Sequence, residues 1–456
     1  MTQAAQYQVT NPATGEVTKT FPFATDEEVE QALATAVSAY EEWRRRPVEE
    51  RVAVVRRVAL LFGERAEELG SLITAEMGKR PSGAKGEAEF CAEIFGYYAD
   101  NGPALLADQP LPGHDGARVQ SLPIGPLLGV MPWNYPYYQV ARFAAPNLIA
   151  GNTILLKHAE NCPTSALAIE QLMHDAGVPE GVYQNIFATH DQVASLISDP
   201  RLRGVSLTGS ERAGTAVAEA AGRNLKKVVL ELGGSDPYIV LDTASVEDAV
   251  DTAWATRMEN MGQACNSNKR MIVMDDVYDG FVAGLVERAK AMKPRTAADD
   301  DAEYDPMVSR KAAENLRDQV EEAVGKGATL HVGGELGENG WLTPAVLTDV
   351  TPEMRAYHEE LFGPIAVVYK VSSDEDAVKL ANDVDFGLGG AVFATDEERA
   401  AKVAEQLEVG MANVNTPAGE GADVPFGGVK RSGFGRELGP LGIGEFVNRR
   451  LFYVQR

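Results

Sequence analysis

The chain has 456 residues, a length that predicts two or three domains rather than a single core. Its net charge of −25 opposes binding to nucleic acid, whose phosphate backbone would repel it, and no apolar run reaches the length of a membrane span. Three cysteines (Cys91, Cys162 and Cys265) are too few for a disulfide framework. With an N-terminus that is neither basic nor apolar, these features predict a cytoplasmic protein.

The first predicted elements are helices. Residues 26–70 have apolar side chains at three- and four-residue steps, with a cap candidate at Asp26, which follows Thr25, and a second helix expected after Pro47. Five prolines then punctuate residues 103–131. This composition predicts extended chain that ends in a strand.

From residue 153 onward, short apolar strands alternate with helices. We expect strands at 153–156, 181–187, 204–207, 227–232, 271–274 and 364–370, and helices at 165–177, 216–225, 245–262, 279–293, 309–326, 375–383 and 396–408. Such alternation predicts α/β domains, each with a parallel sheet covered by helices on both faces. The acidic segment 299–305 is expected to be a solvated loop.

The segment MENMGQACNSNKR, residues 258–270, contains the candidate nucleophile Cys265. A thiolate is the strongest nucleophile that a side chain offers near neutral pH, provided that its pKa is lowered and it is accessible. Gly262, just upstream, would let a ligand approach the backbone closely. The segment alone also fits a small buried cysteine without chemistry.

A phosphate-binding turn is predicted at residues 206–214, SLTGSERAG, where a strand leads through Gly209-Ser210 into a helix. The N–H groups and dipole at a helix N-terminus attract phosphate, although Ser210 alone also fits a simple helix cap. The usual dinucleotide fingerprint, G-x-G-x-x-G after a strand, is absent.

Taken with PWNYP at 132–136, ELGG at 231–234 and ELFGP at 360–364, these segments resemble the NAD(P)-dependent aldehyde dehydrogenases. The resemblance covers the chain from Asn11-Pro12 to the C-terminus. KHAEN (157–161), ELGGSDP (231–237) and PFGGVKRSGFGREL (425–438) are most similar to the succinate-semialdehyde dehydrogenases within that family.

The resemblance implies an α/β fold of two doubly wound, Rossmann-like domains with a small β oligomerisation element. The cofactor-binding domain is expected at 1–110 and 132–231, the catalytic domain at 232–425, and the oligomerisation strands at 111–131 and 436–456. Strands in the last two ranges would join subunits, so the expected partner is a second copy, in a homodimer or homotetramer. The C-terminal RRLFYVQR is apolar and β-prone, which suits that role.

The resemblance also assigns roles to residues. Cys265 would attack the aldehyde, Asn134 would stabilise the oxyanion, and Glu231, at the end of a predicted strand, would activate water to hydrolyse a thioester. The cofactor would be held by residues that match the family's binding positions: Trp133, Lys157, Glu160, Thr208, Gly209, Ser210, Gly214, Leu232, Glu360 and Phe362.

We predict the cofactor and substrate preferences from individual charged side chains. Glu160 would repel a 2′-phosphate, so we expect NAD rather than NADP, although Lys157 could offset part of that charge. Arg142 matches the arginine that holds the far carboxylate in succinate-semialdehyde dehydrogenases. Glu259, six residues before Cys265, would repel that carboxylate or pair with Arg142, unless it turns to solvent. The segment 416–424 is expected to border the substrate entrance.

Other functions have less support. There is no G-x-S-x-G elbow for a serine hydrolase, and His158 and Cys162 lack the second cluster that a zinc site needs, so no metal is expected. A CoA-acylating aldehyde dehydrogenase is the nearer alternative, and Glu231 favours hydrolysis over it. A scaffold relative without activity would have lost Cys265, Glu231 or Asn134.

Overall fold

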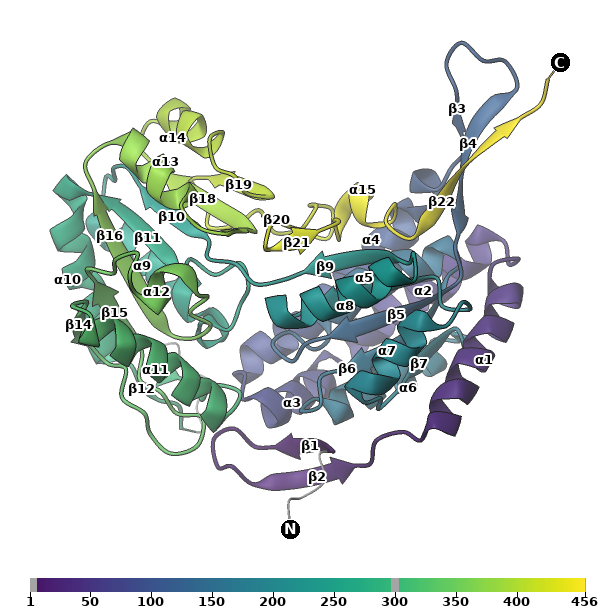
Figure 1. Cartoon of the computed structure of the whole chain (residues 1–456), viewed down its shortest axis with the longest axis horizontal. Coiled ribbons are helices and arrows are strands. Elements are labelled where there is room, and N and C mark those ends of the chain that lie inside the picture. Colours follow the sequence, from purple (N-terminus) through teal and green to yellow (C-terminus); the bar gives the residue numbers. More distant parts are fainter. Residues whose placement is uncertain (1–5, 297–302, 456) are drawn as a thin grey trace.

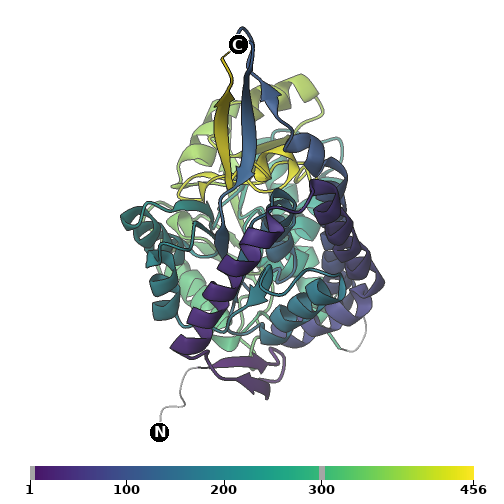
Figure 2. The same ribbon diagram turned by 90° about the vertical axis from the view of Figure 1, so that its right-hand side faces the viewer.

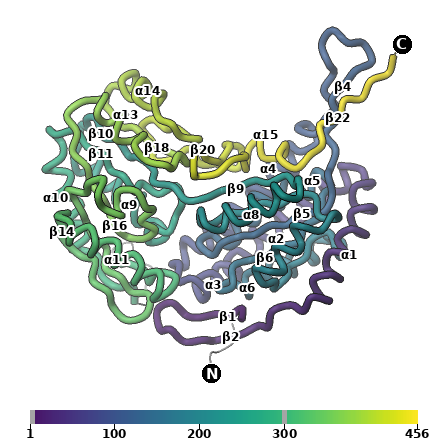
Figure 3. The backbone as a smooth tube through the Cα atoms, viewed as in Figure 1, coloured from purple at the N-terminus to yellow at the C-terminus, as the bar shows by residue number. Residues whose placement is uncertain are grey.

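The computed structural model describes residues 6–296 and 303–455. Two α/β units lie side by side, and a β arm projects from one of them (Figure 1). In the view turned by 90° the arm lies toward the viewer, and its tip extends beyond the body (Figure 2). The tube drawing shows the chain leaving the first unit after β9 and entering the second (Figure 3).

The first unit is built on a six-stranded sheet. Its order is β21 (Gly433–Phe434), β9 (Lys227–Glu231), β8 (Gly204–Thr208), β5 (Pro126–Met131), β6 (Thr153–His158) and β7 (Tyr183–Asn185). Strands β9 to β7 are parallel, and only the short edge strand β21 runs antiparallel.

Helices cover both faces of this sheet. One face packs on α2 (Val48–Glu64), α3 (Ala66–Met77), α4 (Pro81–Leu105), α5 (Tyr138–Ala150) and α6 (Pro163–Asp175). The other packs on α1 (Asp26–Trp43), α7 (His190–Ser198) and α8 (Glu211–Arg223). Successive residues of β6 alternate between these two cores, with Ile154 and Leu156 in the first and Leu155 in the second.

The second unit is built on a seven-stranded sheet. Its order is β14 (Thr329–Val332), β15 (Ala345–Thr348), β16 (Ile365–Val371), β11 (Arg270–Met274), β10 (Pro237–Val240), β18 (Gly389–Phe393) and β19 (Met411–Val414). All pairs are parallel except β14–β15. The helices of this unit are α9 (Val246–Met258), α10 (Asp275–Ala291), α11 (Arg310–Gly325), α12 (Arg355–His358), α13 (Asp374–Asn382) and α14 (Glu397–Ala404).

The arm is a three-stranded antiparallel sheet. It consists of β22 (Val447–Tyr453), β4 (Ala117–Pro123) and β3 (Gln109–Pro110). The remaining short elements are β1 (Tyr7–Thr10), β2 (Val17–Phe21), β12 (Lys293–Pro294), β13 (Glu303–Tyr304), β17 (Phe386–Gly387), β20 (Val429–Lys430) and α15 (Gly439–Gly442).

The predicted class, two doubly wound units with parallel sheets, is confirmed, and the structure corrects its details. β5 lies within the six-stranded sheet, so residues 126–131 do not belong to the range assigned to oligomerisation. Pro103 lies inside a helix instead of starting extended chain, because α4 continues through it to Leu105. Of the acidic segment 299–305, residues 299–302 lie outside the described residues, and Asp305 is buried against Arg80 and Arg295 rather than solvated.

Candidate active site

The predicted site residues gather where loops from the two sheets meet. In the first unit, the predicted site residues lie at or just after the carboxyl ends of parallel strands. Trp133 and Asn134 follow β5, Lys157 lies near the end of β6, Thr208 ends β8 and Glu231 ends β9. In the second unit, Cys265 precedes β11, and Glu360 and Phe362 precede β16. Ligands of open parallel sheets bind at such carboxyl ends.

Cys265 lies on a loop shaped by left-handed backbone. Asn260, Met261 and Gly262 all have positive φ, at 46°, 57° and 68°. A side chain at Gly262 would collide with the carbonyl of Gly363, so glycine is needed there for a neighbouring loop rather than for a ligand. The turn leaves Cys265 half-buried, whereas Cys91 and Cys162 are fully buried.

The Cys265 thiol is a weak acid in this state. Burial raises its pKa to about 12, and the positive charges of Arg142 and Lys269 offset only part of that effect. The thiol is therefore protonated near neutral pH, and its use as a nucleophile requires a group that accepts its proton.

Glu231 can accept a proton at this site. Its side chain is 2% exposed, and neither carboxyl oxygen has a hydrogen-bond partner among the described residues. Burial, and then the charge of Glu437, raise the pKa of Glu231 well above its usual range. A side chain at Gly427 would lie 2.7 Å from Oε1 of Glu231, so the glycine leaves room beside the carboxyl group.

Asn134 is fixed beside the loop that carries Cys265. Its Nδ2 donates to the carbonyl of Gln263 at 3.0 Å, and Nδ2 of Asn260 donates to the backbone carbonyl of Asn134 at 2.9 Å. An amide nitrogen carries two N–H donors, so one remains for a further acceptor. That is the donor an oxyanion requires.

The residues predicted to bind the adenosine and phosphate groups lie at or just after strands of the first sheet. Lys157 and Glu160 form an ion pair at 3.6 Å. Oγ of Ser210 caps α8 by accepting a hydrogen bond from the N–H of Ala213 at 3.3 Å, as expected if Ser210 is a simple helix cap. The buried hydroxyl of Thr208 has no hydrogen-bond partner among the described residues. An unpaired buried hydroxyl beside a helix N-terminus fits a bound phosphate.

Two further predicted pairs are in contact. The rings of Trp133 and Phe362 meet edge to face, 5.8 Å apart. A side chain at Gly214 would lie 2.6 Å from Leu232, so α8 can approach β9 only because this residue is glycine. Gly209 lies between Thr208 and Ser210 in the turn between β8 and α8.

Glu360 connects the two loops through a residue that the sequence analysis missed, Lys269. The ammonium of Lys269 lies 3.0 Å from Oε1 of Glu360 and donates to the carbonyls of Ala264 and Cys265 at 2.6 and 2.7 Å. The N–H of Gly234 donates to the same carboxylate at 3.1 Å. No local pattern marks Lys269, because its ion-pair partner, Glu360, lies far away in the sequence.

Arg142 and Glu259 do not pair with each other. Nε of Arg142 lies 2.8 Å from the carboxylate of Glu437, and the guanidinium stacks on the rings of Tyr138 and Phe426. Glu259 instead accepts a hydrogen bond of 2.8 Å from the hydroxyl of Tyr135. Glu437 was also missed, although it lies in the quoted segment 425–438.

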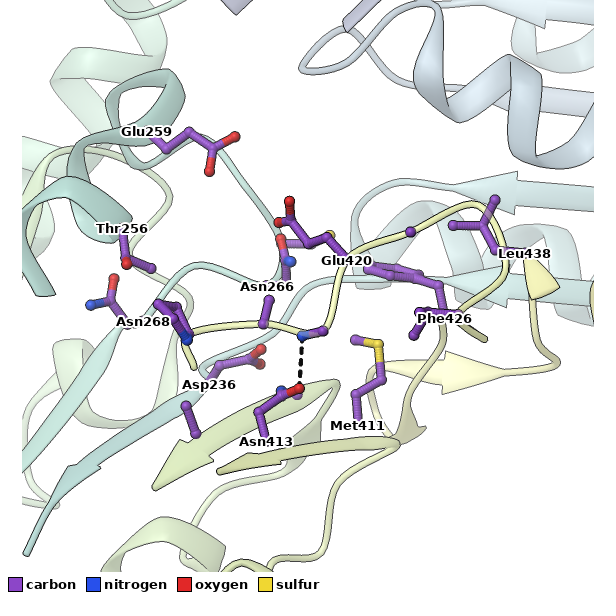
Figure 4. Close-up of a pocket in the computed structure, with 18 of the residues that line it drawn as sticks. Asp236, Thr256, Glu259, Asn266, Asn268, Met411, Asn413, Glu420, Phe426 and Leu438 are labelled. Carbon is purple, nitrogen blue, oxygen red and sulfur yellow. Dashed lines mark hydrogen bonds between the residues drawn. The ribbon is translucent and has the colours of Figure 1, made fainter. Parts of the chain in front are cut away.

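A cavity of about 520 Å³ opens beside Cys265 (Figure 4). Cys265, Asn266 and Glu259 line the cavity together with residues 417–421, part of the segment expected to border the substrate entrance. Tyr138 and Phe426, the rings that cover Arg142, form part of its wall. Figure 4 shows the carboxylates of Glu259 and Glu420 on the same side of the cavity as Asn266.

No cluster of metal-ligating side chains occurs in residues 6–296 and 303–455. His158 is buried with Nε2 2.8 Å from the carbonyl of Pro136, and burial lowers its pKa to about 4. None of the described helices is long and apolar enough to cross a membrane.

Comparison with known proteins places the chain in one family. The model of the "Aldehyde dehydrogenase family" matches residues 1–451. A succinate-semialdehyde dehydrogenase [NADP(+)] of Deinococcus radiodurans is 54% identical over 448 residues, which cover 98% of this chain and 94% of that protein. A second one, from Mycobacterium bovis, is 41% identical over 97% of this chain and 98% of its own.

Solved structures agree at the level of the whole fold. The structure of Gox0499 has a TM-score of 0.96 and 45% identity and covers 99% of this chain and 100% of its own. Succinic semialdehyde dehydrogenase from Streptococcus pyogenes in complex with NADP⁺ has a TM-score of 0.96 and 40% identity, with the same coverage. The chain is therefore an oxidoreductase that belongs to the aldehyde dehydrogenase family.

Proposed function

We propose that the protein oxidises a short semialdehyde to the carboxylic acid, with succinate semialdehyde as the first candidate and NADP⁺ as the acceptor. The observation that carries this proposal is a half-buried thiol, Cys265, that lies within the electrostatic influence of a buried carboxyl group, Glu231, whose oxygens have no hydrogen-bond partner among the described residues. The names of the relatives from D. radiodurans and M. bovis supply the candidate substrate.

Each residue has a role that its surroundings support. Glu231 in its ionised form accepts the proton of the Cys265 thiol, releases it to solvent, and later accepts a second proton from the hydrolytic water. The sulfur forms a bond to the aldehyde carbon, and the free N–H of Asn134 stabilises the resulting oxyanion together with the N–H of Cys265. The nicotinamide, when bound, accepts the hydride. Water then displaces the sulfur, and the acid leaves.

The cofactor proposal replaces the preference for NAD that Glu160 suggested. The relatives from D. radiodurans and M. bovis are named for NADP(+), and the S. pyogenes enzyme was crystallised with it. The carboxylate of Glu160 is 39% exposed and paired with Lys157, so it can turn outward and leave the ammonium near a 2′-phosphate. Glu160→Gln should then change NADP⁺ affinity by less than about threefold, because an exposed pair contributes little.

The proposed assembly is a homodimer or homotetramer joined through the arm. β22 forms one edge of the arm's three-stranded sheet, and Leu451 and Tyr453 on it are 62% and 56% exposed. An exposed apolar edge strand favours pairing with another chain.

The function is tested by steady-state kinetics on the purified protein. We expect oxidation of succinate semialdehyde and of a neutral aldehyde of similar length, with a higher kcat/KM for NADP⁺ than for NAD⁺. Cys265→Ala should abolish turnover, while Cys91→Ala, which removes a thiol from the first core, should keep it. Normal turnover by the Cys265 variant would contradict the proposal.

A further inference from the structure

The charged side chains that line the cavity beside Cys265 all have one sign. They are Glu87, Asp236, Glu259 and Glu420, and none of the described lining residues is a lysine, arginine or histidine. The wall also presents aromatic rings, including those of Phe90, Tyr135, Tyr138 and Phe426. Carboxylates beside aromatic faces attract cations and disfavour a second carboxylate.

Two of these carboxyl groups belong to the deeper structure. Glu87 is bonded to Lys79 and accepts from the N–H groups of Tyr137 and Tyr138. Asp236 is 5% exposed, and its Oδ1 has no hydrogen-bond partner among the described residues. Burial raises the pKa of Asp236 to about 7, so a cation in the cavity would favour its ionised form.

Glu259 is held in place at the cavity by its neighbours. The hydroxyl of Tyr135 donates to Oε1 of Glu259 at 2.8 Å, and the ammonium of Lys79 lies 3.7 Å from the centre of the Tyr135 ring. The sequence did not decide whether Glu259 faces the pocket or turns to solvent. In the structure, Glu259 lines the cavity. The hydrogen bond keeps the carboxylate oriented without neutralising its charge.

Glu420 has no ion-pair partner among residues 6–296 and 303–455, and its loop is anchored. Oδ1 of Asn413 accepts from the N–H of Gly419 at 2.8 Å, which is the dashed line in Figure 4. The loss of hydration beside the cavity, followed by the negative charge of Glu259, raises the pKa of Glu420. The two carboxylates therefore act on the same space.

Arg142, which lies behind the cavity wall, does not supply a compensating charge. Arg142 is 1% exposed, is ion-paired with Glu437 and lies behind the rings of Tyr138 and Phe426. A substrate carboxylate in the cavity would meet Glu259 and Glu420 without a free cation to balance them.

From this lining we infer that Glu259 and Glu420 make the site favour an ammonium group over an uncharged group at the far end of the aldehyde. They also weaken the binding of succinate semialdehyde without preventing its oxidation. The inference rests on the proposed aldehyde oxidation and specifies its substrate class. The chemistry is the same: the aldehyde carbon loses hydride to the nicotinamide and gains oxygen from water, while the ammonium group stays unchanged.

The test compares three aldehydes that differ in charge. These are 4-(trimethylammonio)butanal, its uncharged isostere 5,5-dimethylhexanal, and succinate semialdehyde. We expect kcat/KM to be about tenfold higher for the cation than for the isostere, because two partly exposed ionic contacts act together. The ratio should fall as salt is added, since screening weakens such contacts.

Variants assign the effect to the two residues. Glu259→Gln keeps the acceptor for Tyr135, and Glu420→Gln keeps the side-chain shape. Each should lower the ratio of cation to isostere about threefold and raise kcat/KM for succinate semialdehyde by a similar factor. Glu375→Gln, on the exposed first turn of α13, is the matched control and should change neither value.

Two results would overturn the inference while leaving aldehyde oxidation in place. One is equal efficiency for the cation and its isostere, and the other is an equal effect of the variants on all three substrates. A protein that oxidised none of the three would instead overturn the proposed function, and the inference with it.

Discussion

At the residue scale, Glu231 is the group whose environment is least favourable to its charge. It is buried, lacks hydrogen-bond partners among the described residues and lies near the carboxyl group of Glu437. A carboxyl group in such surroundings keeps its proton at a pH where an exposed one loses it. Glu231 must therefore lose this proton before it can act as a base, and once ionised it binds a proton strongly.

The raised pKa of Glu231 has a consequence for stability. A carboxyl group ordinarily titrates near pH 4.3, so between that value and the raised pKa the unfolded chain binds fewer protons than the folded one. Folding stability contributed by the protonated group below about pH 4 is therefore lost as the pH rises. Glu231→Gln removes this loss.

We expect the melting temperature of Glu231→Gln to exceed that of the natural protein at pH 8 by about 2–4 °C, the shift that about 1 kcal/mol produces in a large domain. The difference should shrink at pH 5, and Glu375→Gln should show no such trend. Melting curves at several pH values measure it. A difference that did not depend on pH would contradict the raised pKa.

At the scale of elements, Arg257 on α9 ties the two loops of the site together. Its guanidinium donates to the hydroxyl of Ser267 at 2.7 Å, in the loop after Cys265. It also donates to the carbonyls of Leu361 and Gly363 at 2.7 and 2.5 Å, in the loop of Glu360. The side chain is fully buried, so these contacts are shielded from water.

Arg257→Lys should lose most of these bonds, because a single ammonium cannot reach groups that a guanidinium spans. We expect the protein to be destabilised by about 2–4 kcal/mol and KM for the cofactor to rise, since the loop of Glu360 loses its anchor. Arg288→Lys, whose exposed guanidinium pairs with Asp251, is the control. Unchanged melting and KM would show that the loops do not depend on Arg257.

The elements also show what sequence patterns can predict. Strands such as β6 and β11 were predicted because buried parallel strands are short, continuous apolar runs. α5 was missed, since nearly all of its side chains are buried, Pro146 lies within it, and no polar face marks its period.

The same limit applies to the site. Residues at strand ends, such as Glu231, could be proposed from the sequence because they belong to short continuous motifs. The Arg142–Glu437 and Lys269–Glu360 pairs join residues that are far apart in the chain, so no local pattern contained them. The acidic lining of the cavity likewise depends on loops from both units.

At the scale of the whole molecule, the arm is the feature that the rest of the fold does not explain. β4 and β22 pair over seven residues, yet the sheet projects away from both cores (Figure 2). Such a sheet gains little from its own burial and is expected to be stabilised by a partner. The cytoplasmic location inferred from the sequence stays a prediction.

Leu451→Arg should weaken the proposed assembly, because a charge would enter its apolar contact. Light scattering after size-exclusion chromatography should give a dimer or tetramer for the natural protein and a smaller mass for the variant. Leu225→Arg, at an exposed leucine after α8, should leave the mass unchanged. A monomeric natural protein would contradict the proposed role of the arm.

The central claim is that Cys265 carries the acyl group and that Glu231 directs its hydrolysis. Intact-mass and peptide mass spectrometry of Glu231→Gln, mixed with NADP⁺ and an aldehyde substrate, test it most directly. The account predicts an acyl adduct on Cys265 alone, with one burst of reduced cofactor before slow turnover. Steady-state turnover equal to that of the natural protein, or an adduct at another residue, would contradict it.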